Sequence, residues 1–182
     1  DTTVFEGRPN WPDSDGSSIW VDQDHDSSGG GEAQGLLKFD LPRSGCGVVQ
    51  ATLRLYTTDW SDGTIDAYRM TSVWDGASTW NSLGGGVQPS QRASTPSFTI
   101  QSPYDGFVER DVTEDVLRWL SRRGDENFGW CFINTDSDDG WEFASSSYSR
   151  DDDDDDNNER ERRPTLIISY GSSMAPTTTP AP

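Results

Sequence analysis

Lysine and histidine are nearly absent from this chain of 182 residues, which contains only Lys38 and His25. Arginine supplies the other basic side chains, and 32 acidic residues against 14 Lys and Arg give a formal charge of −18. Nucleic acids and anionic membranes are bound largely through basic side chains. The charge therefore argues against both partners. No apolar run approaches the ~18 residues that span a bilayer.

Catalytic motifs are lacking as well. The sequence has no GxSxG, no HExxH and no phosphate-binding glycine loop. His25 lies directly beside Asp26 and Ser27, too close in the sequence to form a catalytic triad with them. Paired carboxylates can cleave glycosides, but among 32 acidic residues no pair stands out. We therefore predict that the chain is not an enzyme.

Cysteine is scarce, with Cys46 and Cys131 lying 85 residues apart. This spacing fits neither a CxxC redox motif nor a zinc site. In a secreted domain the pair can close one long loop as a disulfide, worth about 4–5 kcal/mol in the chain-entropy model. The alternative is two separate buried thiols. We expect the disulfide, because the other features of the sequence indicate an extracellular protein.

Short segments of alternating apolar and polar residues make up most of the sequence, and clusters of Gly, Asp, Ser and Pro separate them. In residues 49–57, for example, Ala51, Leu53 and Leu55 share one face of the expected strand. The pattern predicts an all-β fold, an antiparallel β-sandwich of jelly-roll type. The predicted strands are residues 2–5, 18–21, 35–39, 49–57, 64–72, 97–100, 106–112, 129–134, 141–145 and 165–170.

One segment instead predicts a short helix. Asp111 and Glu114 have the spacing of a capping box, with Asp111 as N-cap and Glu114 bonding back to it. Apolar residues then recur at helical spacing up to Leu120, and a cationic turn with Gly124 ends the pattern. We expect this helix to cover an edge or end of the sandwich.

We predict that the domain comprises residues 1–170 and that residues 171–182, GSSMAPTTTPAP, form a Pro/Thr-rich linker to another domain. The acidic run 151–156 should be a solvated loop between the last two strands. Glycans on the tail would stiffen the linker and protect it from proteases. The candidate O-glycosylation sites are Pro176, Thr177, Thr178, Thr179 and Pro180.

Several segments resemble a known family when taken in order along the chain. They include LLKFDLP at 36–42, ATLRLY at 51–56, WDGASTWN at 74–81 and RPTLIISY at 163–170. Shorter matches are residues 1–4, 111–113 with Val116 and Trp119, and 143–145. Together they resemble the DNRLRE domain, a secreted jelly-roll-like module related to an alginate-binding family of carbohydrate-binding modules. The resemblance implies the same fold and an extracellular location.

Two acidic clusters are candidate calcium sites. Ca²⁺ takes six to eight oxygen ligands in flexible geometry, and both clusters lie on turns with glycine. The alternative is an ordinary solvated turn, for which Asp and Gly are the usual residues. The candidate ligands are Asp22, Asp24 and Asp26 in the first cluster and Asp136, Asp138 and Asp139 in the second.

Tryptophan is abundant, with eight residues that fall into two groups. Trp11, Trp60 and Trp141 lie among turn residues, where an exposed indole can stack on a sugar ring. A purely structural role is the alternative for each of them. The others occupy positions typical of a core: Trp20, Trp74, Trp80, Trp119 and Trp130.

Two functions remain, both outside the cell. The favoured one is a non-catalytic structural or adhesive module of a larger secreted surface or filament glycoprotein, with neighbouring domains of the same or like chains as partners. The alternative is a carbohydrate-binding module attached to a polysaccharide-active enzyme. The charge of −18 opposes an anionic glycan unless calcium bridges the two, whereas a neutral polysaccharide meets no such barrier.

Overall fold

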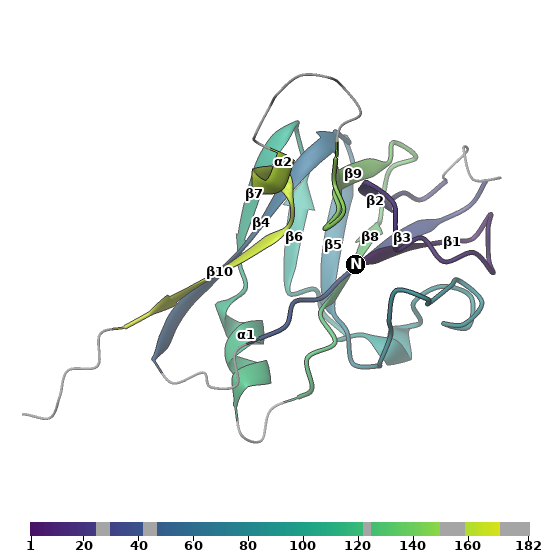
Figure 1. Ribbon diagram of the computed structural model, residues 1–182. Helices are drawn as coiled ribbons and strands as arrows, with labels where there is room; N and C mark the ends of the chain where they lie inside the picture. Colours follow the sequence, from purple (N-terminus) through teal and green to yellow (C-terminus); the bar gives the residue numbers. More distant parts are fainter. Residues whose placement is uncertain (25–29, 42–46, 122–124, 150–158, 172–182) are drawn as a thin grey trace, which may run out of the picture.

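Alternation of buried and exposed side chains folds the chain into two antiparallel sheets that face each other, as the sequence predicted (Figure 1). The structure is a computed structural model that describes residues 1–24, 30–41, 47–121, 125–149 and 159–171. Sheet A has the strand order β1 (Thr2–Phe5), β3 (Ala33–Leu37), β8 (Trp130–Asn134), β5 (Thr64–Arg69) and β6 (Phe98–Gln101). All of its strands lie where alternation predicted them, with ends shifted by up to three residues.

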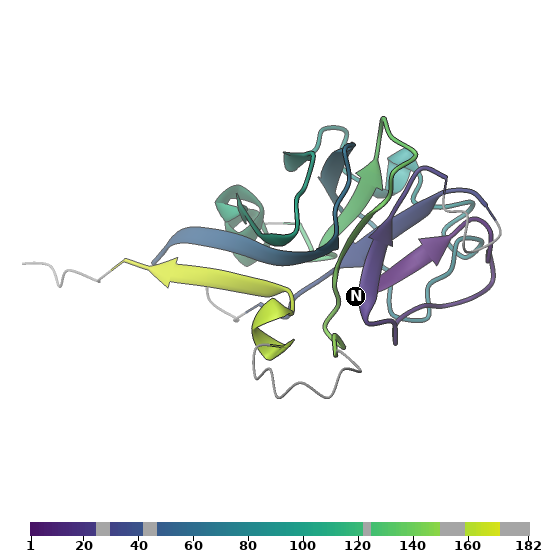
Figure 2. The same ribbon diagram turned by 90° about the horizontal axis from the view of Figure 1, so that it is seen from above.

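Sheet B has the order β10 (Thr165–Tyr170), β4 (Val48–Asp59), β9 (Trp141–Ala144) and β2 (Ser18–Val21). The fifth strand, β7 (Gly106–Asp111), pairs with the other edge of the long strand β4. On their shared edge, β10 pairs with the first half of β4 and β9 with its end. Seen from above, β4 and β10 lie side by side and extend away from the rest of the sandwich (Figure 2).

The main core fills the space between the sheets. Ala51, Leu53 and Leu55 of β4 are buried there, as their alternation predicted. Large aromatic rings from both sheets pack against them, with Phe132 and Phe143 centroids 5.2 Å apart. Burial of such rings supplies most of the hydrophobic stabilisation of a sandwich.

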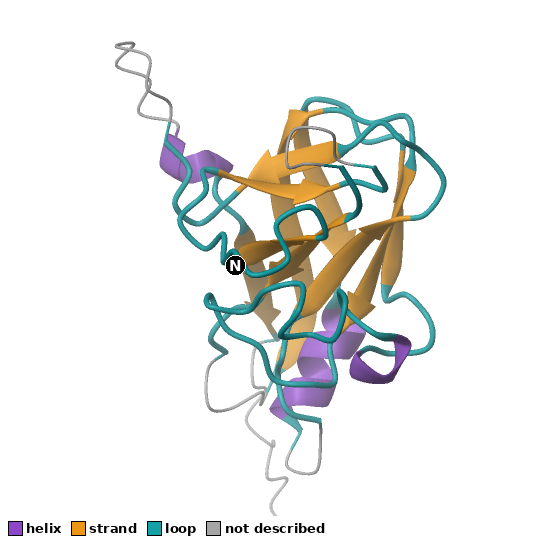
Figure 3. Cartoon of the chain, turned by 90° about the vertical axis from the view of Figure 1, so that its right-hand side faces the viewer, coloured by secondary structure: helices purple, strands orange, loops and turns teal. Residues whose placement is uncertain are grey.

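A second core covers the opposite face of sheet A. Trp74, Trp80 and Leu83, from the long connection between β5 and β6, pack against residues such as Leu36 and Cys131. Figure 3 shows loops in front of the strands on this side of the molecule. Strands β1, β3 and β8 are therefore covered on both faces, which explains why every residue of β3 is buried. Sheet B differs, because its outer face carries the exposed Phe107 and Ile167.

Cys131 lies within this second core as a free cysteine, and burial raises the pKa of its thiol to about 12. Its predicted disulfide partner, Cys46, lies outside the described residues. A buried thiol of raised pKa is unreactive, because the thiolate is the nucleophile. The alternative interpretation, a separate buried thiol, thus describes Cys131.

The predicted helix is present as α1 (Thr113–Leu120), but the predicted capping box is wrong. Asp111 is the last residue of β7 and pairs with Thr52, because the ladder with β4 continues that far. Its Oδ1 still accepts the backbone N–H of Thr113 at 2.8 Å. Glu114 does not reach back and instead pairs with Arg118, one helical turn later, at 3.3 Å. The predicted Gly124 stop lies outside the described residues.

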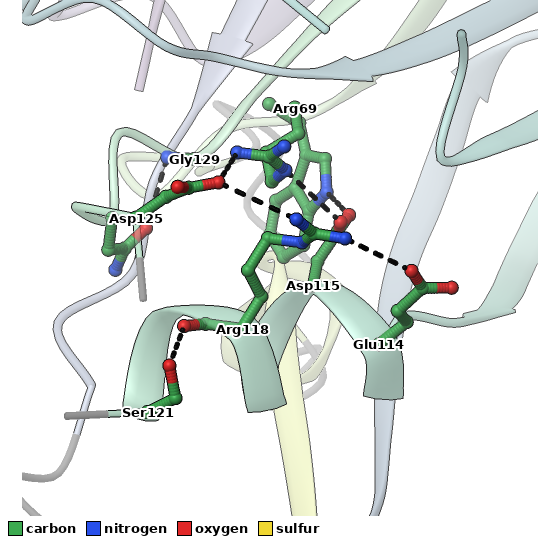
Figure 4. A network of polar contacts seen from close by, with 9 residues as sticks. Arg69, Glu114, Asp115, Arg118, Ser121, Asp125 and Gly129 are labelled. Carbon is green, nitrogen blue, oxygen red and sulfur yellow. Dashed lines mark hydrogen bonds and ion pairs between the residues drawn. The ribbon is translucent and has the colours of Figure 1, made fainter. Parts of the chain in front are cut away.

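Polar contacts attach α1 to sheet A (Figure 4). Trp130 Nε1 donates to Asp115 Oδ2 at 2.8 Å, and Arg69 Nε lies 3.5 Å from Asp115 Oδ1. Arg69 also pairs with Asp125 at 2.7 Å. A short helix, α2 (Glu159–Arg162), precedes β10, and a 3-10 turn covers Pro89–Gln91. No described helix has the length and apolar character needed to cross a membrane.

Candidate functional site

Three turns meet at the upper end of the sandwich in Figure 1, and we call residues 60–63, 102–105 and 135–140 the loop end. They join β4 to β5, β6 to β7 and β8 to β9. The backbone N–H of Ser61 donates to the carbonyl of Pro103 at 3.1 Å, and that of Ser102 to the carbonyl of Gly63 at 2.9 Å. These bonds hold the first two turns against each other.

Two aromatic side chains project from these joined turns. Trp60 is 48% exposed and Tyr104 is 75% exposed. They are immediate neighbours of Ser61 and Pro103, the two residues that bond the turns together. The sequence predicted Trp60 and missed Tyr104, because one tyrosine in a turn has no periodicity. The sequence does indicate a turn at this position, because Pro103 precedes Tyr104 and an Asp-Gly pair follows it.

The turns are fixed in shape before any ligand arrives. Ser102 has φ of +43°, a left-handed conformation that costs a non-glycine residue energy. Its side-chain hydroxyl donates to the carbonyl of Asp62 at 3.2 Å, which helps to hold it there. Gly63 approaches the third turn so closely that a Cβ would lie 2.8 Å from the Cβ of Ser137. A rigid backbone at an exposed loop cluster is typical of a binding site.

The acidic cluster predicted at Asp136, Asp138 and Asp139 lies in the third of these turns. Asp136 Oδ1 accepts the backbone N–H of Thr64 at 2.6 Å, and Asp139 Oδ2 accepts that of Asp62 at 3.2 Å. These carboxylates therefore help to build the turns, and calcium binding by this cluster stays a prediction. Within the described ranges, no three or more His, Cys, Asp or Glu side chains are arranged to hold a metal ion.

The first acidic cluster is nearby but distinct. Asp22 is buried, and its Oδ1 accepts the backbone N–H of Asp24 at 3.1 Å. Asp24 Oδ1 accepts the backbone N–H of Gly31 at 3.1 Å, while Asp26 lies outside the described residues. Asp22 also lies against the end of the third turn, since a Cβ at Gly140 would be 2.7 Å from its Oδ2. The fold thus brings the two predicted clusters together.

A further acidic residue, Glu142, occupies the outer face of sheet B next to the loop end. Its register partners are Trp20 on β2 and Asp59 on β4. The pKa of Glu142 is raised to about 7, mainly by burial and to a smaller extent by the charge of Asp59, against a hydrogen bond with Ser18 that lowers it. The sequence offered no signal for Glu142, because its neighbours come from distant strands.

Of the three tryptophans predicted in loops, Trp60 lies in the loop end, and the prediction that Trp141 is exposed is wrong. Trp141 is fully buried in β9, and its Nε1 donates to Thr57 Oγ1 at 3.0 Å. Its register partner is Val21, which is also buried, so the ring points between the sheets.

Trp11 is 63% exposed but belongs to another loop cluster. The neighbouring Pro9 accepts the backbone N–H of Asn81, and Asn81 Nδ2 donates to Asn10 at 3.0 Å. This places the Trp11 loop against the connection that covers sheet A. The predicted tryptophans therefore form no shared aromatic surface.

Two other surface features lack a free aromatic ring. Phe107 is exposed on sheet B, but the guanidinium carbon of Arg54 lies 5.2 Å from its ring centroid and Tyr56 packs against its edge. A polar cavity of about 360 Å³ lies beside α1, at the lower end of the molecule in Figure 1. Its charged lining residues Arg69 and Asp115 are already paired with each other. Neither offers the free aromatic surface of the loop end.

Comparison with known proteins gives one family. The model of carbohydrate-binding module family 96 matches residues 1–154, most of the chain. The DNRLRE name given by the resemblance is not confirmed by this match. A comparison with curated proteins finds no match.

Proposed function

The chain belongs to carbohydrate-binding module family 96, and from this premise we propose that it binds a neutral polysaccharide at the loop end. The observation that carries the proposal is the pair of exposed rings, Trp60 and Tyr104, on two turns that are bonded to each other. Aromatic rings offer large, rigid contact area to the C–H faces of sugar rings at low entropic cost. Two such rings on a rigid backbone suit successive sugars of one polymer.

The charge of the loop end supports a neutral ligand. Its three turns contain Asp62, Asp105 and the three aspartates of the 135–140 turn, and none of their residues is Lys or Arg. Carboxylates accept hydrogen bonds from sugar hydroxyls, as neutral sugars require. They repel a polyuronate, and the net charge of −18 adds to this repulsion. We therefore propose a neutral ligand for this chain.

The test is a panel of soluble polysaccharides, with β-glucan, xylan and galactomannan as neutral members and alginate and pectin as anionic ones. We expect binding to a neutral member by affinity electrophoresis or calorimetry. Trp60→Ala and Tyr104→Ala should each weaken it at least about tenfold, the effect of removing a central aromatic contact. The melting temperature of each variant must equal that of the wild type, so that weaker binding does not reflect unfolding.

Trp11→Ala is the matched control, because Trp11 is also an exposed tryptophan but lies in a different loop cluster. We expect it to bind like the wild type. Binding that survives both Trp60→Ala and Tyr104→Ala, or that requires Trp11, would place the site elsewhere. Preferential binding of alginate or pectin would contradict the choice of a neutral ligand.

We also propose that the module is non-catalytic and is one part of a longer extracellular protein. A binding module holds its polysaccharide without cleaving it, and the Pro/Thr-rich residues 171–182 have the composition of a linker. Attachment to a polysaccharide-active enzyme replaces, in this proposal, the filament role that the sequence analysis preferred, because such an enzyme gains directly from a module that binds its substrate. The sequence of the neighbouring domains tests this: a hydrolase or lyase supports attachment, and tandem copies of this domain support the filament.

Calcium at one of the two acidic clusters stays a separate proposal. Four of the candidate ligands already accept backbone hydrogen bonds, namely Asp22, Asp24, Asp136 and Asp139. An isothermal titration of chelator-treated protein with millimolar Ca²⁺, followed by a melting curve, decides between a site and ordinary turns. Absence of both heat and a melting shift would remove the ion.

A further inference from the structure

The outer face of sheet B continues the loop end with a row of side chains on three adjacent strands. Trp20 of β2 lies opposite Glu142 of β9, and Glu142 lies opposite Asp59 of β4. The next residue after Asp59 is Trp60, the exposed tryptophan of the loop end. The row therefore contains an indole and two carboxyl groups, and its last residue directly precedes the proposed glycan-binding ring in the chain.

Glu142 is the least solvated carboxyl of this row. It is half-buried, as is Trp20, whereas Asp59 is exposed. Two carboxylates at facing positions of neighbouring strands repel each other, and the repulsion favours a proton on the less solvated of the two. The row therefore has the geometry to keep Glu142 in its acid form.

Among the described residues, the groups that face Glu142 supply no positive charge. From β2 these are Ser18, which hydrogen-bonds it, and Trp20, while the buried Asp22 lies further along, next to Gly140. From β4 the facing charged group is Asp59. Along β9 itself, the other residue on the same face is Ala144, whose methyl side chain carries no charge.

A carboxylic acid can donate one hydrogen bond and accept others, whereas a carboxylate can only accept. We propose, on the premise that the module binds a neutral glycan at the loop end, that Glu142 belongs to the same surface and donates a hydrogen bond to a sugar oxygen while protonated. Ionisation removes this donor and places a second negative charge beside Asp59. Glycan binding then weakens as pH rises.

The change in glycan affinity should fall in the neutral pH range. Burial is the main reason that the pKa of Glu142 is raised to about 7, with the charge of Asp59 adding to it. Below that pH the group is an acid and binding is strong, and above it the donor is lost. The size of the loss should be that of one hydrogen bond, about fivefold to tenfold in affinity.

The experiment measures the dissociation constants of soluble β-glucan, xylan and galactomannan from about pH 5.5 to about pH 8.5, around the expected pKa. Wild type should weaken about fivefold to tenfold toward high pH for the polymer that it binds. Glu142→Gln keeps a donor at every pH, so its affinity should stay near the low-pH value of the wild type. Glu142→Ala should bind weakly throughout, with no slope.

Glu126→Gln is the matched control, since Glu126 is an exposed glutamate beyond α1, far from the loop end. It should keep the full slope of the wild type. A wild-type slope that persists in Glu142→Gln overturns this inference while leaving the proposed function intact. Binding that is insensitive to Trp60→Ala, or absent at every pH, overturns the proposed function and this inference with it.

Discussion

The fold buries or half-buries several acidic side chains in this chain of charge −18, among them Asp22, Asp115 and Glu142. Each has a different environment. Asp22 accepts a hydrogen bond from a backbone N–H. Asp115 accepts one from an indole N–H and forms an ion pair with an arginine, whereas Glu142 faces another carboxylate. Burial favours the neutral form unless a partner stabilises the charge. The environment of Glu142 therefore favours its neutral form.

The stability of the protein should depend on pH through Glu142. Its pKa is about 7 in the folded state against an ordinary value of 4.5 for glutamate, so the folded state holds the proton more tightly. This contribution to stability is complete below pH 4.5, declines as pH rises, and is lost above pH 7. Glu142→Gln cannot ionise and should not show the decline.

The measurement is the melting temperature of Glu142→Gln minus that of the wild type at about pH 4.5, 6 and 8, which spans the two pKa values. The difference should rise with pH and level off above neutrality. Subtraction removes the effect of other groups, such as Asp13, whose pKa burial also raises. A difference that is constant over this range would show that Glu142 titrates like an exposed glutamate.

Helix α1 depends on contacts to sheet A, because eight residues are too few for a stable isolated helix. Asp115 holds it by accepting from Trp130 Nε1 and pairing with Arg69, both in buried surroundings. Asp115→Ala leaves the indole N–H without its partner and Arg69 with Asp125 alone. We expect a loss of about 2–4 kcal/mol in the free energy of unfolding.

Chemical denaturation checks this value, with Glu114→Gln as the control. Glu114 is on the same helix, but its side chain is 88% exposed and its bridge to Arg118 is an i,i+4 surface pair. Such a pair contributes about 0.3–0.5 kcal/mol. Equal effects of the two substitutions would mean that the buried network does not hold the helix.

Most strands were predictable from the sequence because burial on one face requires alternation, as Leu53 and Leu55 demonstrate in β4. The ends of the strands and the cap of the helix were not predictable from the sequence. Asp111 has the spacing of an N-cap, yet its pairing with Thr52 draws it into a strand. That pairing joins residues far apart in the sequence and leaves no local signal.

The candidate site also contains residues that the sequence could predict and residues that it could not. Trp60 was predictable, because a tryptophan among Asp, Ser and Gly indicates an exposed turn. Trp141 has a similar local sequence but points inward, since its register with Val21 decides which face it occupies. Glu142 acquires its environment from Trp20 and Asp59 on other strands. Composition could predict the chemistry of the site, whereas only the sheet register locates it.

At the scale of the whole molecule, the two sheets are covered unequally. The connection that contains Trp74 and Trp80 packs on the outer face of sheet A. On sheet B, α2 lies over Tyr56 through Arg162, and Phe107 and Ile167 are exposed. We expect a polymer bound at the loop end to extend over the exposed part of sheet B. This asymmetry agrees with a module that binds chains.

The charge of −18 should destabilise the folded state through self-repulsion, which salt screens. Raising NaCl from about 10 mM to about 100 mM shortens the screening length from about 30 to about 10 Å. We expect the melting temperature to rise by about 2–4 °C, equivalent to about 1 kcal/mol for a chain of this length.

The matched variant replaces the six aspartates of 151–156 by Asn, which removes a third of the excess negative charge and leaves the rest of the chain unchanged. Its melting temperature should rise less with NaCl than that of the wild type, because less repulsion remains to be screened. Repeating the titration near pH 4, where carboxylates begin to protonate, should reduce the effect in both proteins. A melting temperature that falls with NaCl would mean that specific ion pairs, such as those of Arg69, outweigh the general repulsion.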